Sequence, residues 1–175
     1  MIPGILIALL TFPGVIVHEL AHQLFCRLTR TAVYDVCYFR FGNPSGYVIH
    51  EPPTTQMKHV IIGIGPFLVN SILGALIAFP AVIPACIFSS GTPLDYFLVW
   101  LGVSIAMHAF PSRGDAKSIW AGVKQQKGNV LVKIAVAPIV AIIYLGAFGS
   151  VFWLDLFYGV VVVIALPATL TALLA

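Results

Sequence analysis

Long apolar stretches alternate with short polar ones along the whole chain. The first apolar stretch runs from Ile2 to Phe25, the second from Val60 to Phe88, and the third from Leu94 to Phe110. Residues 130–175 are apolar enough for two further spans, with a turn near residues 149–155. A helix needs roughly 20 apolar residues to cross a bilayer. The pattern therefore predicts an all-α polytopic membrane protein with about five transmembrane helices.

The polar stretch at residues 29–58 contains the pattern that favours strands. Residues 32–41 are rich in Val, Tyr and Phe, residues 42–46 (Gly-Asn-Pro-Ser-Gly) favour a turn, and residues 47–49 resume the apolar pattern. Two such runs joined by a short glycine-containing loop are typical of a β-hairpin. We therefore expect a small cytoplasmic hairpin over residues 33–49, with a five-residue loop.

The composition agrees with a membrane protein. Only 9% of the residues are charged and 60% are apolar, and the mean hydropathy is +1.03. Soluble domains carry about 25% charged residues, so an integral membrane protein is indicated. We expect a single domain over residues 1–175, because the spans leave no room for a separate soluble domain. The three cysteines have no spacing typical of a metal site or a disulfide framework.

The basic residues indicate the orientation. With five spans, every lysine and arginine falls on one side of the membrane, whereas the opposite side carries only Asp95 and Asp155. The basic residues are Arg27, Arg30, Arg40, Lys58, Arg113, Lys117, Lys124, Lys127 and Lys133. By the positive-inside rule, residues 29–58 and 111–129 are cytoplasmic and the N-terminus is outside. The net charge of +3 therefore needs no nucleic-acid partner to explain it.

His18, Glu19 and His22 form an H-E-x-x-H motif in the first apolar stretch. Residues four apart lie on one face of a helix, so His18 and His22 can offer imidazole nitrogens to one metal ion. Glu19 can then accept a proton from a water molecule that the metal activates. Ionisable groups at membrane depth cost roughly 2.5–3.5 kcal/mol each and are seldom present without a use. A buried structural cluster is the alternative, but it does not require this order and spacing.

A third metal ligand must come from elsewhere in the chain. A catalytic zinc usually takes three protein ligands and keeps one position open. The segment 107–115 offers His108 and Asp115. Asp115 also fits a capping box with Ser112, in which case it would start a helix after that residue. His108 could instead be a hydrogen-bonded core histidine. The residues alone leave both candidates open.

Taken together, the motifs resemble the site-2 protease family of intramembrane zinc metalloproteases. The resemblance covers roughly residues 10–120. It is carried by the H-E-x-x-H motif, by Gly65-Pro66 with Asn70, and by Pro111 with Asp115. In that family the two motif histidines and a distant aspartate bind zinc, and the motif glutamate is the base. The resemblance therefore implies one Zn²⁺ per chain held by His18, His22 and Asp115, with Glu19 as the catalytic residue.

The chain departs from the family pattern at three places. Glycine precedes Asp115 instead of following it, no asparagine stands before Pro111, and Asn70 is one residue further from Gly65 than in the family. We also expect no regulatory domain, which would make this a minimal, divergent member with further spans over residues 130–175.

The function we expect is a zinc-dependent intramembrane endopeptidase in the cell membrane, with its active site towards the cytoplasm. Its partners are a transmembrane protein or peptide substrate and the lipid bilayer. The substrate helix must unwind locally, because a helix hides its carbonyls. The hairpin either pairs with the unwound segment as an added strand or only caps the site.

The alternative function is that of a non-proteolytic membrane metal-binding or transport protein, which the absence of an internal repeat disfavours.

Overall fold

The computed structural model describes residues 4–125 and 130–174 and is mainly helical, with one small sheet. The helices are α1 (Gly4–Leu10), α2 (Phe12–Leu28), α3 (Gln56–Val82), α4 (Pro93–Met107), α5 (Arg113–Gln125), α6 (Val130–Gly149), α7 (Leu154–Val160) and α8 (Leu166–Leu174). The strands are β1 (Val33–Cys37) and β2 (Tyr47–His50), and short turns of irregular helix cover Ile83–Ile87, Ser150–Phe152 and Val161–Ala165. The expected helical fold with one hairpin is confirmed at this level.

The first apolar stretch forms two helices instead of one. Thr11 separates α1 from α2, with backbone angles (φ −123°, ψ 29°) outside the helical region. Pro13 follows as the second residue of α2. Proline fits the first turn of a helix because the N–H it lacks would have no helical partner there. The loosening that Pro13 and Gly14 predict is therefore a helix break at Thr11, and α2 carries the whole H-E-x-x-H motif.

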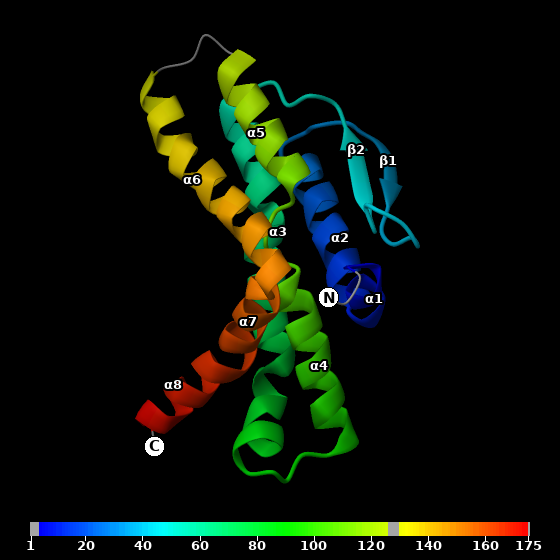
Figure 1. Cartoon of the computed structure of the whole chain (residues 1–175), viewed down its shortest axis with the longest axis vertical. Coiled ribbons are helices and arrows are strands. Elements are labelled where there is room, and N and C mark those ends of the chain that lie inside the picture. The colour runs from blue at the N-terminus through cyan, green and yellow to red at the C-terminus, as the bar shows by residue number, and fades with distance from the viewer. Residues whose placement is uncertain (1–3, 126–129, 175) are drawn as a thin grey trace.

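Helix α3 is the longest element and extends along most of the molecule (Figure 1). With its terminal turn it covers Gln56–Ile87, 32 residues, which at 1.5 Å per residue is on the order of 48 Å. Helix α4 returns beside it. A Cβ on Gly74 would lie 2.7 Å from the carbonyl oxygen of Gly102, so the two glycines permit this close crossing. Thr92 and Asp95 form a capping box that starts α4.

The last helices do not form the pair of neighbouring spans that was expected. Helix α6 packs against α5, whereas α7 packs against α4. Figure 1 shows α6, α7 and α8 following one another down the length of the molecule. The expected turn at residues 149–155 exists, with Trp153 at φ 62°. It lies near the middle of the molecule (Figure 1). There Phe110, just after α4, contacts both Tyr158 (ring centroids 4.9 Å apart) and Gly146. Asp155 therefore does not share an end of the molecule with Asp95.

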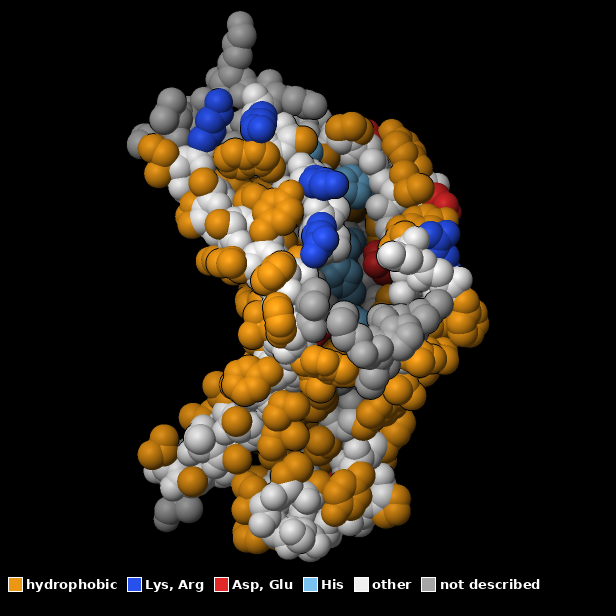
Figure 2. Space-filling model, in the orientation of Figure 1, with side chains coloured by type: hydrophobic (Ala, Val, Ile, Leu, Met, Phe, Trp, Pro, Cys, Tyr) orange, Lys and Arg blue, Asp and Glu red, His pale blue; other side chains and the backbone are white. Residues whose placement is uncertain are grey.

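Two helical segments among the described residues, Gln56–Ile87 and Leu154–Leu173, are long and apolar enough to cross a membrane. Only 33% and 17% of their most apolar windows are buried, whereas a core helix of a soluble protein would be mostly buried. Pro93–Met107 and Lys133–Gly149 are shorter apolar helices. A membrane association is thus supported, but the count of five spans is not confirmed. In Figure 2, hydrophobic side chains cover the lower half and all the visible lysines and arginines lie in the upper half.

The hairpin forms as predicted but has a longer loop. Strands β1 and β2 are antiparallel, with Val36 opposite Val48 and Cys37 opposite Tyr47. Strand pairing ends there, so the loop covers residues 38–46, although Arg40 N–H still donates to the Ser45 carbonyl (2.7 Å). The sheet lies beside α2 (Figure 1). It is therefore well placed to border anything that α2 carries on that side.

Candidate metal centre

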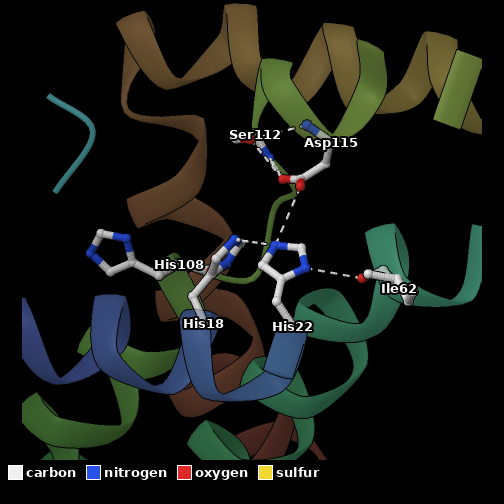
Figure 3. A network of polar contacts seen from close by, with 6 residues as sticks. All are labelled: His18, His22, Ile62, His108, Ser112 and Asp115. Carbon is white, nitrogen blue, oxygen red and sulfur yellow. Dashed lines mark hydrogen bonds and ion pairs between the residues drawn. The ribbon is translucent and has the colours of Figure 1, made fainter. Parts of the chain in front are cut away.

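The two motif histidines meet on one side of α2, as their spacing predicts. Their rings are packed edge to face with centroids 4.8 Å apart, and their Nε2 atoms lie 3.2 Å apart. Figure 3 shows both rings rising from α2 towards the start of α5. Because the spacing of four residues alone fixes this pairing, the sequence was sufficient to predict it.

Both rings are oriented by backbone carbonyls. His18 Nδ1 donates to the carbonyl of His108 (2.7 Å), and His22 Nδ1 donates to the carbonyl of Ile62 (3.0 Å). A carbonyl can only accept, so each Nδ1 carries a proton, and each Nε2 has a free lone pair when the ring is neutral. Two such lone pairs 3.2 Å apart repel unless a cation lies near both. The arrangement is the one that metal-binding histidines usually show.

Asp115 completes the cluster from the first turn of α5. Its Oδ1 lies 3.4 Å from His22 Nε2. Its Oδ2 accepts hydrogen bonds from the Ser112 N–H (2.7 Å) and hydroxyl (2.6 Å), and the Asp115 N–H donates back to that hydroxyl (3.2 Å). The capping box and the approach to the histidines therefore occur together, because they use different carboxylate oxygens. Burial alone would raise the pKa of Asp115, but in the absence of a metal a protonated His22 and the hydrogen bonds from Ser112 lower it below the usual carboxyl value.

The donor set fits a zinc ion. The ligand atoms of His18, His22 and Asp115 all lie within 4.8 Å of one another. Ligand atoms about 2.0–2.1 Å from a tetrahedral zinc stand roughly 3.3 Å apart. The distances of 3.2 Å and 3.4 Å centred on His22 match this value, and the third pair, His18 and Asp115, lies within 4.8 Å and would have to close around the ion. Two imidazoles and one carboxylate also leave one coordination position open, as catalytic zinc sites do.

The ring of His108, the other candidate ligand, is not part of this group. Its Nε2 lies 2.8 Å from the hydroxyl of Thr11, and in Figure 3 the ring points away from the histidine pair. The main-chain carbonyl of His108 contributes to the site instead, because it accepts a hydrogen bond from His18. No side-chain pattern in the sequence marks such a carbonyl, so sequence reasoning missed it.

Asn70 ties the helices together beneath the site. It is fully buried, and its Nδ2 lies within 3.1–3.2 Å of the carbonyls of Gly14, Ile105 and His108. These carbonyls belong to α2 and to the end of α4, so one amide group fixes both against α3. The asparagine that the sequence marked only by its place in a motif thus supports the carbonyl that orients His18.

Glu19 lies in the same cavity as the proposed ligands. The cavity measures about 730 Å³ and is lined by His18, Glu19, His22 and Asp115, and by hairpin residues 43–48. Glu19 is buried, with 8% of its surface exposed, and makes no hydrogen bond within the described part of the chain. Gly46 packs directly on its side chain. Figure 2 shows histidine and acidic side chains at the floor of a hollow beside the hairpin.

The geometry thus groups all four site residues that the sequence predicted: three with mutually close ligand atoms and one beside them in the cavity. The structure adds Gly46 and the carbonyls of Ile62 and His108 as supporting groups, and it gives Asn70, already noted in a sequence motif, its contacts. Comparison of the chain with protein-family models, with curated proteins and with solved structures gave no match, so the geometry of this centre is the basis for assigning a function.

Proposed function

We propose that the protein is a zinc-dependent intramembrane endopeptidase, related to the site-2 protease family that its motifs resemble. One observation carries the proposal. His18, His22 and Asp115 present two imidazole nitrogens and a carboxylate oxygen within 4.8 Å, and the buried carboxyl of Glu19 shares their cavity. A structural cluster would not require a free carboxyl group beside three metal-type ligands.

A zinc ion held by these residues would supply Lewis-acid chemistry, polarising a carbonyl and making water more acidic. The chain's own residues do the rest. Glu19 accepts the proton of the attacking water and passes it to the leaving amine, which needs a carboxylate without a competing hydrogen bond. The carbonyls of Ile62 and His108 keep the two rings in the tautomer that leaves Nε2 free.

The cavity bears on how substrate is held. Its volume of about 730 Å³ can take several residues of an extended chain but not an intact helix with its side chains. An unwound transmembrane segment has free N–H and C=O groups, which are costly near lipid. Strand β2 borders this cavity, whereas β1 borders a different polar hollow with Gln23 and Arg27 of α2. The edge that we propose for substrate pairing is therefore that of β2.

We further propose that the protein is multi-pass and that its basic end faces the cytoplasm. Helix α4 begins at the end of the molecule opposite the basic residues. Its 15 residues extend on the order of 22 Å towards the metal centre. The metal centre would then lie towards the cytoplasmic side of a bilayer core about 30 Å thick. Because α6, α7 and α8 follow one another along the molecule, we propose that they make one membrane crossing instead of the two expected over residues 130–175.

Removal and return of the metal tests the proposal. The assay is cleavage of a single-span model peptide in proteoliposomes, with zinc measured by mass spectrometry. A chelator should remove one zinc per chain and stop cleavage, and zinc should restore it. Unchanged cleavage by the zinc-free protein would refute the proposal.

A further inference from the structure

Two histidines outside the metal centre meet next to it. His50 is the last residue of β2, and His59 lies in the first turn of α3. Both line a second cavity of about 30 Å³, together with Asp115 and Ser118 of α5. His50 also lines the large cavity that holds the metal centre. The small cavity is therefore a neighbour of the centre, on the side where α3 and α5 meet the hairpin.

One side of the His59 ring packs against α5. Gly122 of α5 packs so closely on it that a Cβ at Gly122 would overlap the ring atoms. The carbonyl of Pro53 lies beside the ring, and the buried Nδ1 has no hydrogen-bond partner of good geometry among the described residues. Buried polar atoms are nearly always paired, and leaving one unpaired costs about 1–3 kcal/mol. An imidazole that packs against α5 and has a buried nitrogen without a well-placed partner can serve as a ligand.

His50 resembles the ligands of the main centre in its hydrogen bonding. Its Nδ1 donates to the carbonyl of Glu51 (2.7 Å), which leaves Nε2 with a free lone pair. His18 and His22 are held by backbone carbonyls in the same manner. This is the arrangement by which proteins usually orient a metal-binding imidazole.

The size and donors of the cavity define what it can hold. A volume of about 30 Å³ accommodates one ion or a water molecule, and no organic ligand. Imidazole nitrogens favour zinc, cobalt, nickel and copper over magnesium and calcium. Asp115 already contacts Ser112 and His22. Among the residues that line this cavity, His50 and His59 are therefore the two strong ligands for an ion. Such an ion binds more weakly than one with three ligands.

We propose that His50 and His59 form a second, weaker site for a divalent transition-metal ion beside the main centre. This inference goes beyond the proposed function, because it holds for any use to which the protein puts the ion.

Metal titration of the purified, metal-free protein in detergent tests it. Cobalt is the probe, followed by its absorbance and counted by equilibrium dialysis. The wild type should bind two equivalents, the second roughly 10-fold or more weakly than the first. The double variant His50→Ala/His59→Ala should keep the first and lose the second. The double variant His18→Ala/His22→Ala should lose the first and keep the second.

Two further variants serve as controls for this titration. His50→Gln/His59→Gln keeps polar side chains of similar size and should also lose the second equivalent, so misfolding of the alanine pair cannot decide the outcome. Asp35→Asn, at a nearby exposed carboxylate, should keep both. A single equivalent in the wild type, or a second that survives in both His50/His59 variants, would overturn the proposal. Either result would leave the hydrolytic proposal untouched.

Discussion

Gly46 is where the hairpin loop touches Glu19, so replacing it by alanine tests how the proposed base is positioned. A Cβ at Gly46 would lie 2.7 Å from Glu19 Cγ and 3.0 Å from its Oε1. Ordinary contacts begin at 3.4 Å, so the loop or the Glu19 side chain must move by about 0.7 Å, the difference between 3.4 and 2.7 Å. Gly46 has no positive φ, so alanine fits the backbone conformation and the perturbation is steric: the contacts with Glu19 and one of 3.0 Å with the Tyr38 carbonyl.

A shift approaching 1 Å at a catalytic group costs on the order of 100-fold in rate. We therefore expect Gly46→Ala to lower the single-turnover rate of peptide cleavage by about 10- to 100-fold, with the zinc content unchanged. The matched control is Gly42→Ala in the same loop, where the nearest atom to a new Cβ is 3.7 Å away. That variant should cleave like the wild type. Wild-type rates in Gly46→Ala would refute the reasoning.

Three further predictions concern the ligands, the hairpin and the orientation. Asp115→Ala should weaken zinc binding more than His108→Ala, as measured by competition with a chelator, and the reverse order would make His108 the ligand. Val48→Pro and Ile49→Pro lie at consecutive positions of β2, so one of them removes the N–H of the edge that faces away from β1. That variant should lose cleavage and keep zinc, and full activity in both would exclude this edge as the substrate site. A cysteine at Ser90 should react with membrane-impermeant reagents only from outside, and labelling from the cytoplasm would reverse the orientation.

The motif-level features of the site could be predicted because they depend on local spacing. His18 and His22 pair because four residues make about one helical turn. Asp115 was predicted to be either a cap or a ligand, and the structure shows both contacts at once. The two roles are compatible because a carboxylate has two oxygens, a possibility that residue types and spacing do not reveal.

The features that could not be predicted depend on tertiary packing. The carbonyl of His108 orients His18, and a carbonyl is present at every residue, so no side-chain signal distinguishes it. The end-to-end path of α6 and α7 is another case. Hydropathy predicts apolar helices and the turn between them, but not whether they fold back. That is decided by close contacts such as Gly159 with Met107, which hold α7 against α4.

The most direct test of the central claim is cleavage of a single-span peptide by the wild type and by Glu19→Gln in the same proteoliposomes, at equal zinc content. Glutamine keeps the shape of the side chain and loses its basicity. General-base catalysis contributes about 100- to 10,000-fold, so the variant should retain one zinc per chain and lose cleavage by that factor. Undiminished cleavage by zinc-loaded Glu19→Gln would contradict the account.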